Sequence, residues 1–109
     1  MGKGKYLNEL KRFLKNLSKD FLIKKIILFG SRARGDERED SDIDIIIISN
    51  DFENMSFFER GAAMYNYWDL KMPVDFICYT EEEFNTLRKK ISLVKEALKN
   101  GIIIGQNSG

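Results

Sequence analysis

The chain has 109 residues, with 18 basic and 17 acidic side chains and a formal net charge of +1. This near-neutral balance argues against the strong positive field that drives nonspecific nucleic-acid binding. The sequence has no His and only one Cys, Cys78, which excludes His-based catalysis, an ordinary zinc site and an internal disulfide. Any catalysis must therefore use carboxylates.

The composition predicts one folded domain spanning residues 1–109, with 43% hydrophobic and 32% charged residues. The N-terminal sequence MGKGKYLNELKRF has no apolar signal region. No segment approaches the roughly 18 apolar residues of a membrane span. We therefore expect a cytoplasmic protein that makes no membrane contact.

The first half of the chain predicts a helix followed by two strands. Apolar residues recur at helical spacing from Tyr6 to Phe21, which indicates an amphipathic helix. The β-branched segment Ile23–Phe29 ends at Gly30 and predicts a strand that leads into a tight turn. A wholly polar loop, residues 35–41, precedes a strand over Asp42–Ile48 that should be covered on both faces near its end.

The second half predicts two more helices around a third strand. Ser56 with Glu59 begins a helix that should run to about Leu70, and Pro73 leads into a strand. That strand is Val74–Tyr79. The remaining elements are a helix that opens with the capping-box pattern of Thr80 and Glu83 and ends near Asn100, and a short edge strand in the final GIII.

This order of elements predicts an α/β or α+β domain in which helices pack on a small mixed sheet. The sequence contains no internal repeat and no interdomain linker. The pattern of elements does not determine the order of the strands in the sheet.

Two groups of residues indicate a phosphate and metal site. Gly30 and Ser31 follow a strand, where free backbone N–H groups and a hydroxyl attract phosphate oxygens, although a plain capped turn would look the same. Asp42 and Asp44 are two residues apart on a strand, so their carboxylates share one face about 6.6 Å apart. Such a pair suits Mg²⁺, although solvated acids beside a loop are also common.

Asp75 is the candidate for a third carboxylate because it interrupts an otherwise apolar strand. We expect it to be buried, where an ionised side chain is costly unless it is paired or bound to metal. If its strand lies beside the Asp42–Asp44 strand, Asp75 could bind metal or act as a general base.

Other polar and aromatic residues allow two interpretations. Arg32 and Arg34 could clamp a triphosphate or form surface ion pairs with the acidic residues around them. The aromatic residues of the second predicted helix could form a stacking platform or a partner surface, but in a small domain they are expected to be core. They are Phe57, Phe58, Tyr65, Tyr67 and Trp68.

The run GSRARGDEREDSDID places GS ten residues before DID. It resembles the GS-x10-D-x-D motif of the DNA polymerase beta superfamily of nucleotidyltransferases, and within it the minimal nucleotidyltransferases of bacteria and archaea. The resemblance covers most of the chain. It implies that Gly30 and Ser31 hold the triphosphate, and that Asp42, Asp44 and Asp75 bind two Mg²⁺ ions and activate the acceptor hydroxyl.

The resemblance also implies a partner. Members of this family serve as antitoxins of all-helical HEPN-domain ribonucleases, and some silence the toxin by adding AMP to it. We therefore expect transfer of AMP from ATP, or another nucleotide from its NTP, to a partner protein. The small size favours an acceptor presented by a partner or by a second subunit of a homo-oligomer.

Two other functions remain open at this point. The domain could be a binding module that masks its partner and keeps only a vestigial nucleotide site. It could also be a small-molecule nucleotidyltransferase of the antibiotic-modifying type. Three acids around one predicted site argue against pure masking.

Overall fold

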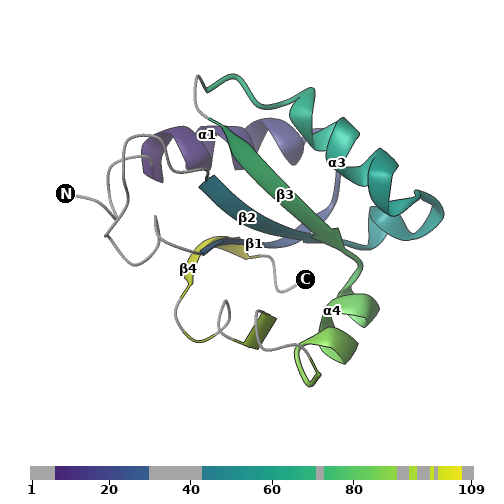
Figure 1. Ribbon diagram of the computed structural model, residues 1–109. Helices are drawn as coiled ribbons and strands as arrows, with labels where there is room; N and C mark the ends of the chain where they lie inside the picture. Colours follow the sequence, from purple (N-terminus) through teal and green to yellow (C-terminus); the bar gives the residue numbers. More distant parts are fainter. Residues whose placement is uncertain are drawn as a thin grey trace.

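The computed structural model describes residues 7–29, 43–70, 73–90, 94, 95, 99 and 101–106 (Figure 1). The described strands form one sheet of four strands with helices on both faces. In chain order the elements are α1 (Leu7–Leu17), β1 (Ile23–Phe29), β2 (Ile43–Ser49), the 3-10 helix η2 (Asn50–Asn54), α3 (Phe57–Tyr65), β3 (Val74–Tyr79), α4 (Glu81–Leu87) and β4 (Ile102–Gln106).

The sheet is mixed, as the sequence predicted, and its strand order is β3-β2-β1-β4. β1 pairs antiparallel with both β2 and β4, whereas β2 and β3 run parallel. Parallel neighbours need a crossover between them, and α3 provides it. The structure therefore supplies the strand order that the sequence pattern did not determine.

Two apolar layers cover the sheet. Ile43, Ile45 and Ile47 pack with α1, η2 and α3 in one cluster. The alternate residues Ile46 and Ile48 pack with Phe84 of α4 in the other. Successive side chains of a strand point to opposite faces, so a strand buried on both faces needs an unbroken apolar run. The isoleucine run of β2 meets this requirement.

The helices begin where predicted but end sooner. Both capping boxes are present, Ser56 with Glu59 at α3 and Thr80 with Glu83 at α4. α3 ends at Tyr65 and α4 at Leu87, and hydrogen bonds from each N–H to the carbonyl three residues earlier tighten the chain after both helices. The predicted ends near Leu70 and at Phe21 were therefore wrong. The helix predicted to end near Asn100 is broken after Leu87, although Val94, Lys95 and Lys99 are again helical.

The 3-10 helix η2 was not predicted at all. It begins with a local cap, because the hydroxyl of Ser49 accepts a hydrogen bond from the N–H of Asp51.

In the described part of the chain no helix is long and apolar enough to cross a bilayer.

The buried side chain of one arginine, Arg60, makes hydrogen bonds that join four elements. Arg60 of α3 is 5% exposed. Its Nε donates to the carbonyls of Phe52 and Met55 at 3.0 and 3.1 Å, and its Nη1 donates to the carbonyl of Cys78 at 3.1 Å. Its guanidinium also forms a bidentate pair with Glu83 at 2.6 and 3.1 Å. One cation thereby ties η2, α3, β3 and α4 together.

Side chains of α3 also cover the outer edge of β3. The N–H of Ile43 donates to the carbonyl of Pro73, which indicates that the alternate carbonyls of β3 point away from β2. Two of these, from Val74 and Cys78, accept hydrogen bonds from Tyr65 and Arg60 of α3. An edge strand whose carbonyls are occupied in this way is a poor template for further strand pairing.

Candidate active site

The predicted site residues divide between the described and the undescribed parts of the chain. Asp44 lies on β2 and Asp75 on β3. The other predicted residues, Gly30, Ser31, Arg32, Arg34 and Asp42, lie outside the described residues. Their roles stay predictions, and the geometry of the candidate site rests on the two aspartates and their neighbours.

Asp44 and Asp75 lie directly opposite each other across the parallel pair of β2 and β3. Residues in register on adjacent parallel strands project from the same face, with the strands about 4.8 Å apart. The two carboxylates therefore share one face, the one on which Ile46 and Ile77 pack toward α4. The adjacency that the sequence analysis assumed is present in the structure.

The end of β1 meets the same place. Phe29, its last residue, lies opposite Asp44 in the antiparallel pair of β1 and β2. Gly30 and Ser31 follow Phe29 directly in the sequence, so the chain leaves the sheet at the strand position beside Asp44. Three segments that are distant in sequence thus converge at one end of the sheet.

The expected burial of Asp75 was wrong. Asp75 is exposed, whereas Asp44 is half-buried. The reason is its position: β3 is an edge strand, and Asp75 is its second residue, at the opposite end from α4. A carboxylate at this position is open to a molecule that approaches from solution.

Carboxylates on one face of adjacent strands are suited to hold a hard divalent cation, because Mg²⁺ prefers oxygen ligands and takes one or two from the protein. Within the described ranges, no group of three acidic, His or Cys side chains could form a metal cluster. The remaining carboxylate of the predicted set, Asp42, is two residues before Asp44 and outside those ranges.

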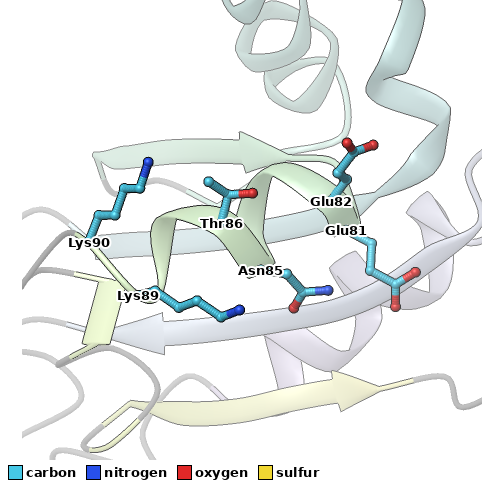
Figure 2. Close-up of a pocket in the computed structure, with 6 residues that line it drawn as sticks. All are labelled: Glu81, Glu82, Asn85, Thr86, Lys89 and Lys90. Carbon is cyan, nitrogen blue, oxygen red and sulfur yellow. The ribbon is translucent and has the colours of Figure 1, made fainter.

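Two surface hollows lie elsewhere. One, of about 470 Å³, runs along α4 between acidic and basic side chains (Figure 2). The other, of about 410 Å³, lies between Glu53 of η2 and the start of α4. α4 follows the carboxyl end of β3, and Glu81 is six positions after Asp75, so these hollows are not the carboxylate site.

The aromatic residues of the second predicted helix differ in how far they are buried. Tyr67 and Trp68 pack against the main core, as expected. Phe57 and Phe58, in the first turn of α3, are 59% and 85% exposed, so the expectation that they are core residues was wrong. The position of a residue in the first turn of a short helix does not determine which neighbours will cover it.

Cys78 is the small buried hydrophobe that the sequence predicted. It is 1% exposed, and burial raises the pKa of its thiol to about 12. A thiol with such a pKa is protonated at neutral pH, so it is not a nucleophile.

A mixed sheet whose parallel strands present paired carboxylates, beside a strand that Gly-Ser follows in the sequence, matches the nucleotidyltransferase class that the motif predicted. The chain belongs to the nucleotidyltransferase domain family, whose sequence model matches residues 7–102. It is a minimal nucleotidyltransferase.

Relatives in Methanocaldococcus jannaschii support this assignment. A protein named "Putative protein adenylyltransferase MJ1215" is 36% identical over 76 residues, which are 65% of this chain and 88% of that protein. A second, "Putative protein adenylyltransferase MJ1379", is 44% identical over 79 residues, which are 67% of this chain and 78% of that protein.

Solved structures share the fold. A crystal structure described as a putative nucleotidyltransferase from Sulfolobus solfataricus has a TM-score of 0.65 and 25% identity, and the match covers 94% of this chain and 81% of that one. A toxin–antitoxin crystal structure with AMP-PNP has a TM-score of 0.58, and that match covers 90% of this chain and 74% of the other. At 22% identity, the second likeness shows the fold alone.

Proposed function

We propose that the protein transfers a nucleoside monophosphate, AMP from ATP, to a hydroxyl group of a partner protein in the cytoplasm. The single observation that carries this proposal is the pairing of Asp44 with Asp75 beside the end of β1. The names of the two Methanocaldococcus jannaschii relatives support AMP as the transferred group and a protein as its acceptor.

The residues fit a magnesium site. Asp44 and Asp75 present carboxylate oxygens from adjacent strands, and one of the two is open to solvent. With Asp42, they would hold two Mg²⁺ ions. When bound, such ions neutralise phosphate charge and lower the pKa of an attacking hydroxyl.

The other roles follow from position. Gly30 and Ser31 begin where β1 ends beside Asp44, so their N–H groups and the hydroxyl would hold the triphosphate there. Asp75 is exposed at the sheet edge and would receive the proton of the acceptor hydroxyl. The hydroxyl oxygen would then bond to the α-phosphorus as pyrophosphate leaves. Arg32 and Arg34 would steer the triphosphate or pair with the acidic loop.

For the partner we propose an all-helical HEPN-domain protein, with this chain as its antitoxin. The support is the motif resemblance together with the fold shared with a toxin–antitoxin structure. The alternative, a masking module with a vestigial nucleotide site, is favoured by one observation, the exposed aromatic pair Phe57 and Phe58. The two proposals differ in whether turnover is needed.

Incubation of the protein with the product of its neighbouring gene, Mg²⁺ and each α-³²P-labelled NTP tests the proposal. We expect label from ATP on the neighbour, and none with the Asp42→Asn, Asp44→Asn double variant. A tight complex without label would support the masking module instead.

A further inference from the structure

The most exposed aromatic side chains of the described structure lie at the start of α3, and one of them reaches the end of β3, where α4 begins with acids. Phe57 and Phe58 lie in the first turn of α3. The ring of Phe57 lies 6.3 Å from that of Tyr79 at the end of β3, where α4 begins with three glutamates. We call the surface formed by Phe57, Phe58, Tyr79, Glu53, Glu81 and Glu82 the aromatic–acidic surface.

Several contacts hold these elements together. The N–H of Glu81 donates to Asn50 Oδ1 at 3.0 Å, which joins α4 to η2. Arg60 joins η2 and α3 to Glu83 of α4. The acid-lined hollow of about 410 Å³ opens between Glu53 and Glu82. The surface is therefore assembled from four elements, η2, α3, β3 and α4, that these contacts hold together.

The charged side chains of this surface are all acidic, although Lys89 and Lys90 line the neighbouring hollow of α4 together with Glu81 and Glu82. Glu53, Glu81 and Glu82 are exposed, and no cation of the described residues pairs with their carboxylates. From residue 50 to residue 83, the described chain has one basic side chain, Arg60, which is buried and bound to Glu83. The acids of the surface itself therefore favour a cationic partner over nucleic-acid phosphates or anionic lipids.

We propose that the aromatic–acidic surface binds a basic amphipathic segment of a partner protein. The apolar side chains of that segment would cover Phe57 and Phe58, and its Lys or Arg side chains would pair with Glu53, Glu81 and Glu82. Aromatic anchors surrounded by complementary charge are typical of protein interfaces. Exposed phenylalanines in a charged setting have no comparable role in the fold of an isolated domain.

The position of this surface suits the transfer reaction. Asp75, Ile77 and Tyr79 alternate along β3, so all three lie on one side of the strand. Tyr79 is four residues from Asp75, which is about 13 Å along a strand. A segment docked at Phe57 would therefore hold its protein beside the carboxylates. The inference rests on the proposed function only in that the acceptor is a protein.

An NMR titration of the full ¹⁵N-labelled chain tests the proposal. The probe is a synthetic amphipathic helical peptide of Leu and Lys, and the matched control is the same peptide with Glu in place of Lys. We expect the Lys peptide to shift the amides of Phe57, Phe58 and Glu82, and added salt to weaken its binding. The Glu peptide should cause no shift.

Two matched variants distinguish peptide binding at this surface from nonspecific binding to any exposed apolar side chain. Phe58→Ser should weaken peptide binding by about ten-fold or more. Leu22→Ser removes another exposed apolar side chain, 76% exposed, and should leave binding unchanged. Glu82→Gln should weaken binding and reduce its salt dependence.

Three results would overturn the proposal. They are peptide shifts confined to other elements, equal binding by the Phe58→Ser and Leu22→Ser variants, and self-association of the wild-type chain that Phe58→Ser abolishes, which would make a second copy the occupant. None of these variants changes Asp44 or Asp75, so loss of peptide binding with intact nucleotidyl transfer, or the reverse, shows which proposal fails.

Discussion

Asp44 and Asp75 are register partners on parallel strands, although 31 positions separate them in the sequence. The α3 crossover brings them together, and antiparallel pairing places the end of β1 on the other side of Asp44. The candidate active site is thus a property of strand order. A one-residue slip between β2 and β3 would place the two carboxylates on opposite faces of the sheet.

The carboxylate pair should bind a divalent cation. Asp44→Asn and Asp75→Asn should each weaken Mn²⁺ binding by about ten-fold or more, because each removes a charged oxygen ligand. Electron paramagnetic resonance of free Mn²⁺ measures this binding. Asp69→Asn, an exposed acid beyond the end of α3, is the matched control and should bind as the wild type does. Equal binding by all four proteins would contradict the assignment.

Arg60 should be a major source of stability. Arg60→Met leaves the carbonyls of Phe52, Met55 and Cys78 without their donor, and Glu83 without its cation. Leaving these carbonyls without their donor costs about 1–3 kcal/mol in the free energy of unfolding, and the ion pair adds little because the Glu83 side chain is 43% exposed. Urea denaturation measures the loss. Arg88→Met, at an exposed arginine, should stay within about 0.5 kcal/mol of the wild type.

The same network predicts a pH dependence. The hydrogen bond from Arg60 holds the pKa of Glu83 below its usual 4.5, and the backbone N–H of Thr80 adds to this effect. The folded state therefore binds the Glu83 proton more weakly than the unfolded state does. The ionised carboxylate stabilises the fold above pH 4.5, and this contribution is lost as the pH falls below that value.

Glu83→Gln tests this dependence. The variant should be less stable than the wild type at neutral pH, and the difference should narrow as the pH falls below 4.5. Denaturant unfolding across that range gives the comparison. A difference that stays constant with pH would show that the charge of Glu83 does not contribute.

Cys78 should resist alkylation in the folded protein. Its thiol is buried, with a pKa of about 12, so both access and the thiolate are lacking at neutral pH. Iodoacetamide labelling followed by mass spectrometry should modify it only after denaturant is added. Rapid labelling of the native protein would show that β3 opens readily at Cys78.

The sequence predicted the elements better than their ends. Strands Ile23–Phe29 and Val74–Tyr79 were correct at both boundaries, because β-branched runs end at Gly, Pro or a helix cap. The helix ends at Tyr65 and Leu87 were missed, because turns with backbone hydrogen bonds to the carbonyl three residues earlier replace the helix there without any Gly or Pro.

For the site, the GS and DID motifs and the later Asp75 predicted which residues form one site. The pairing of Asp44 with Asp75 agrees with the part of this prediction that falls on described residues. The exposure of Asp75 was not predictable, because it depends on β3 being an edge strand. Arg60 and the exposed Phe58 were missed for a related reason. Which neighbours cover a helix residue is decided by tertiary packing.

The most direct test of the central claim compares nucleotidyl transfer by single carboxylate variants. The wild type, Asp44→Asn, Asp75→Asn and the control Asp69→Asn would be incubated with α-³²P-labelled ATP, Mg²⁺ and the neighbouring gene product. We predict labelled acceptor with the wild type and Asp69→Asn, and a loss of at least about a hundred-fold with either of the other two. Undiminished transfer by Asp44→Asn or Asp75→Asn, in folded protein, would contradict the claim that this pair carries the reaction.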